Sequence, residues 1–135
     1  MDFAVSSILL YSLVGAVVLV YVPFGLVGLA RMQVGYDISA PRAMFDKLPP
    51  YAQRATWAHQ NSFEALIIYA IAALMAYVTG VTSPWASGAA LVFLGARFFY
   101  SVFYIANIPL ARSLMFATGS TCSGILFVLS LLTLI

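Results

Sequence analysis

Charged residues are scarce in this chain, and their scarcity excludes several classes of protein. Six of the 135 residues are Lys or Arg and four are Asp or Glu. Charged residues thus make up 7% of the chain, against about 25% in an average soluble domain. The mean hydropathy is +1.03. A net charge of +2 without a basic run offers nucleic acid no binding surface. We therefore expect an all-α integral membrane protein.

Cysteine and histidine each occur only once. A single cysteine, Cys122, excludes an internal disulfide and a cysteine-built metal site, and we expect it to be a buried thiol. His59 has no His, Cys or paired Asp at ligand spacing, so no metal is expected. A glycine-rich phosphate loop, a GxSxG string and a Ser-His-Asp set are also missing. The common hydrolase and nucleotide sites are therefore excluded.

Long apolar stretches predict four transmembrane helices in a single domain over residues 1–135. We place the helices at about residues 3–33, 50–79, 84–106 and 109–133. Each exceeds the roughly 20 residues that a membrane crossing needs. Pro23 should kink the first helix, because proline removes a backbone hydrogen bond. The segment Met1–Phe3 lacks the basic region and cleavage site of a signal peptide, so we expect the first helix to be retained.

The basic residues predict how the helices are oriented. Arg31, Arg42, Lys47 and Arg54 flank the connection between the first two helices, a polar loop of about 15–18 residues. Arg112 flanks the connection between the last two. Loops rich in Lys and Arg stay on the cytoplasmic side. Both connections are therefore expected to be cytoplasmic, with both termini on the other side of the membrane.

Polar side chains open the second helix and form the first candidate site. Arg54 and Asn61 are seven residues apart, about two turns, so they lie nearly on one line of the helix. Glu64 follows one turn later, whereas His59 points to the opposite side. Ionisable residues in a membrane helix are costly and generally pair with one another or meet a ligand. The stretch therefore indicates a functional site.

A second candidate site spans the end of the third helix. Arg97, Tyr100 and Tyr104 share one helical face, and Arg112 begins the next helix. Arg97 either pairs with Glu64 to fix the helix register or faces a ligand. The tyrosines also fit the aromatic belt of a membrane interface. Arg112 either reaches lipid phosphate or, beside the positive end of a helix dipole, holds an anion.

These residues resemble the motifs of the MAPEG family, the membrane-associated proteins in eicosanoid and glutathione metabolism, and look closest to its bacterial members. The resemblance rests on the four spans, the polar first loop, the string Arg54-x-x-x-Ala58-His59-x-Asn61-x-x-Glu64, and Arg97-x-x-Tyr100-x-x-x-Tyr104. Two departures exist. Ile67 and Ile68 stand where many members have a proline, and Gln60 stands where some have an arginine.

The resemblance implies a homotrimer of four-helix subunits that holds glutathione, its co-substrate, between neighbours at the cytoplasmic side. Arg112 would stabilise the glutathione thiolate and Arg31 would lie near the thiol, so both are catalytic candidates. Glu64 would meet the amino group. The glutathione-binding candidates are Arg54, His59, Gln60, Asn61, Glu64, Arg97, Tyr100 and Tyr104.

The function that the resemblance implies is a glutathione transferase or glutathione peroxidase in the bacterial inner membrane. Its lipophilic substrates, electrophiles or hydroperoxides, would arrive from the lipid bilayer. The alternative is a non-catalytic lipid- or glutathione-binding protein of the same fold. A third interpretation is a small structural or transport subunit whose charges only fix helix pairing.

Overall fold

The computed structural model describes residues 3–135, so the expectation for Met1 and Asp2 lies outside the described residues. The described chain forms α1 (Phe3–Gln33), η1 (Pro41–Lys47), α2 (Pro50–Val78), α3 (Pro84–Ile105) and α4 (Pro109–Thr133). Helices α1 to α4 are each long and apolar enough to cross a membrane. The all-α prediction is confirmed, and the chain is an integral multi-pass membrane protein.

Local sequence signals set the ends of these helices. A proline opens η1, α2, α3 and α4 at positions 41, 50, 84 and 109. Proline suits the first turn because its missing N–H would have no helical partner there. Gly80 and Asn107 follow α2 and α3 with φ of 73° and 60°, a left-handed backbone that these two residue types adopt most readily. Both turns are therefore tight.

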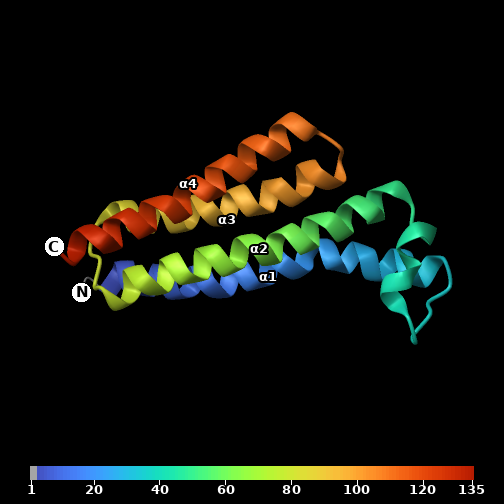
Figure 1. Cartoon of the computed structure of the whole chain (residues 1–135), viewed down its shortest axis with the longest axis horizontal. Coiled ribbons are helices and arrows are strands. Elements are labelled where there is room, and N and C mark those ends of the chain that lie inside the picture. Colours follow the sequence, from blue (N-terminus) through green and yellow to red (C-terminus); the bar gives the residue numbers. More distant parts are fainter. Residues whose placement is uncertain (1–2) are drawn as a thin grey trace.

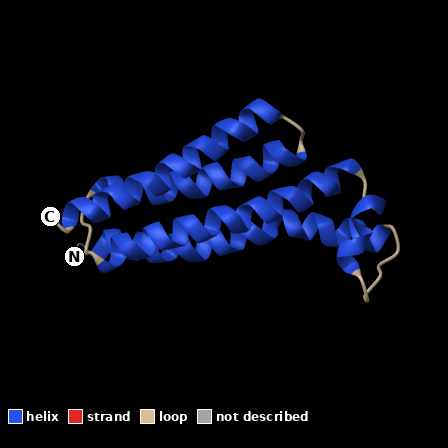
Figure 2. Cartoon of the chain, viewed as in Figure 1, coloured by secondary structure: helices blue, strands red, loops and turns tan. Residues whose placement is uncertain are grey.

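The helices pair into two antiparallel hairpins, α1 with α2 and α3 with α4 (Figure 1). Both termini and the α2–α3 turn lie at one end of the bundle. The α1–α2 connection and the α3–α4 turn lie at the other end, toward which the two hairpins diverge (Figure 1). Only short loops join the helices (Figure 2). The polar stretches at the start of α2, the end of α3 and the start of α4 therefore belong to the diverging end.

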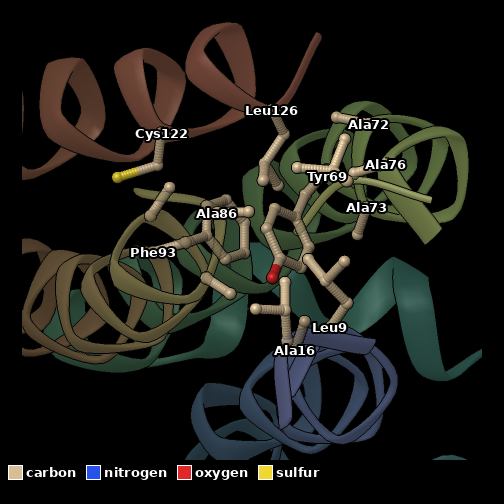
Figure 3. Packing of buried hydrophobic residues seen from close by; sticks show 14 residues of the cluster. Leu9, Ala16, Tyr69, Ala72, Ala73, Ala76, Ala86, Phe93, Cys122 and Leu126 are labelled. Atoms are coloured by element: carbon tan, nitrogen blue, oxygen red, sulfur yellow. The ribbon is translucent and has the colours of Figure 1, made fainter. Parts of the chain in front are cut away.

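One aromatic stack lies at the centre of the core (Figure 3). The ring of Tyr69, fully buried, lies 3.7 Å from that of Phe93 with an interplanar angle of 6°. Its hydroxyl hydrogen-bonds Ser12 of α1. Leu126 and Cys122 of α4 complete the cluster, so residues from all four helices meet there. Cys122 is buried, as expected.

The α1–α2 connection contains a helix that the sequence did not predict. Residues 41–47 fold as the 3-10 helix η1, although the connection was expected to be a loop. Pro41 suits the first turn of η1, and Met44 is its buried residue. Gln53 Nε2 of α2 also donates to the Phe45 carbonyl at 3.2 Å. These contacts hold η1 against the start of α2.

Candidate functional site

Arg97 lies at the centre of the polar residues and is 4% exposed. Its Nη2 donates to Asn61 Oδ1 at 3.0 Å and to Ser62 Oγ at 3.1 Å. Asn61 Nδ2 in turn donates to Glu64 Oε2 at 3.4 Å. The guanidinium is therefore linked to the carboxylate through Asn61, and the sequence hypothesis of a direct Arg97–Glu64 pair is replaced by a hydrogen-bonded chain.

The aromatic residues of α3 join Arg97 to Arg112. The Arg97 Cζ lies 3.9 Å from the centre of the Tyr100 ring, and the Arg112 Cζ lies 4.6 Å from that of Tyr104. The two tyrosine rings are 5.6 Å apart at 76°. Cation–π contact with an aromatic face stabilises a guanidinium, and more strongly where water is excluded. We call these four residues the Arg–Tyr row.

Arg54, in the first turns of α2, bonds to the end of α3 that carries the Arg–Tyr row. Its Nε donates to the carbonyl of Ile105, the last residue of α3, at 2.9 Å. A cation beside a helix C-terminus meets unpaired carbonyls and the negative end of the helix dipole. Arg54 and Asn61 thus both bond to α3, as expected for two residues on one line of a helix.

His59 lies on the opposite side of α2, against α1. Its Nδ1 is 2.6 Å from the Val20 carbonyl oxygen, so Nδ1 must carry the hydrogen, since a carbonyl only accepts. The ring lies among those of Tyr21, Phe24 and Phe63, at 5.7, 4.8 and 5.0 Å. Gln60 is exposed. His59 therefore does not reach the Arg–Tyr row, and no hydrogen bond or ring contact among the described residues joins Gln60 to it.

Arg31 lies in the last turn of α1 and makes no contact with the Arg–Tyr row. Its Cζ lies 5.8 Å from the ring of Phe24 in the same helix, and its Nε is buried without a hydrogen-bond partner. Within residues 3–135, no hydrogen bond or ring contact joins Arg31 to Arg97 or Arg112. Arg31 and Arg112, the two arginines expected to be catalytic, are thus not neighbours within the chain.

Two contacts of the site escaped sequence reasoning. Ser62 follows Asn61 directly and accepts a hydrogen bond from Arg97, but one more serine in an apolar helix gives no signal in a sequence. Trp57 links η1 to the row, with ring centres 5.5 Å from Phe45 and 6.4 Å from Tyr104. Its position one turn after Arg54 could have indicated that it shares the polar face of α2.

A cavity of about 300 Å³ opens beside Arg97 between α2, α3 and α4. One part is polar and is lined by Asn61, Glu64 and Arg97. The remaining lining residues are apolar, small or hydroxylic: Ala65, Ile68, Phe93, Phe116, Gly119, Ser120, Ser123, Gly124 and Phe127. Ligand cavities generally measure about 300–1,000 Å³. The cavity therefore suits a small ligand with a charged part and an apolar part.

The charge around the site is unbalanced. Arg54, Arg97 and Arg112 gather at the diverging end, whereas Glu64 is the single acidic residue in the described parts of α1 to α4. Arginine stays charged at any physiological pH. The partners found for these arginines are an amide, a hydroxyl, a carbonyl and aromatic rings, none of which carries negative charge. This surplus of positive charge suits an anionic ligand.

Comparison with known proteins yields one finding. The model of the MAPEG family matches residues 8–132, which take in all or most of each of the four membrane helices. No curated protein and no solved structure matches the chain.

Proposed function

Because the chain belongs to the MAPEG family, we propose that it binds glutathione and activates the glutathione thiol toward lipophilic electrophiles or hydroperoxides. The family includes membrane glutathione transferases and peroxidases and typically uses glutathione. The observation that carries the proposal is the Arg–Tyr row beside a cavity that is polar at Arg97 and mainly apolar elsewhere.

Glutathione has the charges that this site would complement. It carries two carboxylates and one ammonium group, so its net charge at neutral pH is negative. Arginine recognises carboxylates through charge-assisted hydrogen bonds, and Arg54 would supply a pair of them because only its Nε is engaged within the described chain. Arg97, whose Nη2 already donates to Asn61 and Ser62, would add its positive charge. Glu64, exposed beside the cavity, would receive the ammonium group. Asn61, Tyr100 and Tyr104 would supply neutral hydrogen bonds around the peptide.

Arg112 would stabilise the thiolate. It stands in the first turn of α4, where the helix dipole adds positive potential to its own charge. A free thiol has a pKa of about 8.5, so little of it is ionised at neutral pH. Lowering that pKa by about 1–2 units, roughly 1.4–2.7 kcal/mol, would make thiolate the main or a substantial form. The thiolate sulfur then attacks the electrophilic carbon, and the leaving group departs with the bonding electrons.

A homotrimer would complete the site. Arg31 and His59 contact α1 and not the Arg–Tyr row, and Gln60 is exposed. We propose that a neighbouring subunit presents these three residues to the row, with glutathione between the subunits. Arg31 would then lie near the thiol as the second catalytic arginine. The diverging end of the bundle would face the cytoplasm of a bacterial cell, with both termini across the inner membrane.

One contact favours the non-catalytic alternative. Stacking on Tyr104 gives Arg112 a partner within the protein, so its charge need not serve a thiolate. In that case the protein would bind glutathione or a lipid without turnover. Turnover of detergent-purified protein with glutathione and a chlorinated nitrobenzene, or an organic hydroperoxide, separates the two functions. Saturable glutathione binding without turnover on either substrate would leave only the binding function.

A further inference from the structure

Arg97 has one polar group that the contacts described above leave unexplained. Its Nε is buried and has no hydrogen-bond partner, although its Nη2 has two. The side chain as a whole is 4% exposed. Leaving a buried donor of a charged group without a hydrogen-bond partner costs more free energy than leaving a neutral donor unpaired. A further acceptor is therefore needed close to this nitrogen.

A second, small cavity borders the same side chain. It lies between α1, α2 and α3 and is lined by Ala16, Leu19, Val20, Ser62, Leu66, Phe93 and Arg97. The space open to the centre of a water molecule is about 10 Å³. A water-sized sphere itself occupies roughly 10–15 Å³. The cavity thus has the size of a single water molecule.

Helix α1 supplies acceptors at the level of this cavity because of Pro23. Proline has no N–H, so Pro23 cannot donate to the carbonyl of Leu19, which would receive the helical hydrogen bond from that position. The next carbonyl, that of Val20, already accepts from His59 Nδ1 at 2.6 Å. Leu19 and Val20 both line the cavity. The backbone of α1 before Pro23 therefore already accepts a hydrogen bond from α2 at Val20, and the carbonyl of Leu19 lacks its helical donor.

We propose that this cavity holds one ordered water molecule, which accepts a hydrogen bond from Arg97 Nε and donates one to the Leu19 carbonyl. Ser62 Oγ is its third partner, since Ser62 also lines the cavity and the hydroxyl hydrogen is not used in accepting from Arg97. Three hydrogen bonds are the usual number for a buried water, and each partner is a group that would otherwise be unpaired or only partly paired.

The water would extend the hydrogen-bonded chain of the site into α1. The chain then runs from the Leu19 carbonyl through water to Arg97, Asn61 and Glu64. Ser62 and Pro23 would then be positioning residues. Ser62 bonds the Arg97 guanidinium directly, and Pro23 leaves the Leu19 carbonyl open to the water, so the guanidinium is held in place although no carboxylate in the described part of the chain contacts it. This inference does not depend on glutathione, and the failure of one leaves the other standing.

Two conservative variants of α1 test the water by the sign of a stability change. Val20→Ile adds one methyl group to the cavity wall, and Val27→Ile makes the same change outside the cavity; both valines are 1% exposed. Displacing the water would leave Arg97 Nε without a hydrogen-bond partner. The Tm of the Val20→Ile variant should therefore lie about 2–8 °C below that of Val27→Ile. Filling a dry cavity stabilises a protein, so an equal or higher Tm would overturn the proposal.

The second measurement is direct and distinguishes water loss from simple overpacking. An experimental structure of the full chain, at a resolution that shows ordered waters, should contain density within hydrogen-bond distance of Arg97 Nε and the Leu19 carbonyl oxygen. That density should disappear in Val20→Ile. Clear density for the surrounding side chains without a water between them in the unmodified protein would overturn the proposal, whatever the melting result.

Discussion

Each arginine at the site finds a neutral partner instead of a carboxylate. Arg97 donates to an amide and a hydroxyl, Arg54 to a backbone carbonyl, and Arg112 lies over an aromatic ring. Such partners reduce the cost of holding a guanidinium at membrane depth and leave its charge uncompensated. This combination is what an anion-binding site requires, since a directly paired carboxylate would compete with the ligand.

Glu64 should act on binding more than on folding. It is exposed and touches Arg97 only through Asn61, so Glu64→Ala should leave the Tm nearly unchanged. Loss of a charge-assisted hydrogen bond to the ligand ammonium, about 1.5–3 kcal/mol, should weaken glutathione binding roughly 10- to 150-fold. Isothermal titration calorimetry measures the affinity, with Glu64→Gln as the isosteric control. Unchanged affinity in the folded Ala variant would remove Glu64 from the site.

Arg112 should act on chemistry more than on binding. Arg112→Ala should lower the conjugation rate at saturating glutathione about tenfold, equivalent to roughly 1.4 kcal/mol, and largely preserve affinity. Arg112→Lys should restore only part of the rate, because lysine lacks the fork of donors. Arg42→Ala removes an exposed arginine of η1 and is the control for net charge. If Arg112→Ala turns over at the unmodified rate, Arg112 is an interfacial anchor and Arg31 becomes the better candidate.

At the level of single residues, spacing in the sequence predicted faces but not partners. Helical geometry correctly separated His59 from Asn61, because both belong to one helix. The stacking of Arg112 on Tyr104 crosses the α3–α4 turn. It depends on the left-handed conformation of Asn107, which no helical period describes. Contacts between residues of different helices therefore could not be predicted from spacing in the sequence and are seen only in the structure.

The four membrane helices could be predicted from hydropathy, whereas η1 could not. Four apolar stretches of sufficient length are dictated by the cost of burying backbone and charge in lipid, so they stand out in the sequence. A seven-residue 3-10 helix buries little more than Met44 and has no periodic signal of its own. Its place is set by contacts such as that of Gln53 with the Phe45 carbonyl, which join separate elements.

Arg54 should contribute to the stability of the fold, because it joins two helices. Its bond to Ile105 ties the start of α2 to the end of α3, and Arg54 is partly buried, so Arg54→Ala should destabilise the fold by about 1–2 kcal/mol. We expect a lower Tm in detergent, and Arg54→Lys should recover part of the loss. Arg42→Ala again serves as control. A Tm equal to that of the control would show that the contact with α3 adds no stability.

The whole molecule exposes large apolar side chains along its helices, as a membrane protein must. Arg31 and His59 contact α1 residues and not the Arg–Tyr row. We expect a homotrimer, because Arg31, His59 and Gln60 can then reach the Arg–Tyr row of a neighbour. Native mass spectrometry in mild detergent should give a mass of three chains. A monomer that retains glutathione binding would contradict this arrangement.

The central claim is that the protein binds glutathione and stabilises its thiolate. The most direct test is a pH titration of bound glutathione, in which the ultraviolet absorbance of the thiolate is recorded on the detergent-purified protein. S-methylglutathione, which has no ionisable thiol, is the matched control for absorbance changes of the protein. We predict an apparent thiol pKa about 1–2 units below the free value of about 8.5. Saturating binding with a thiol pKa at or above the free value would contradict the account.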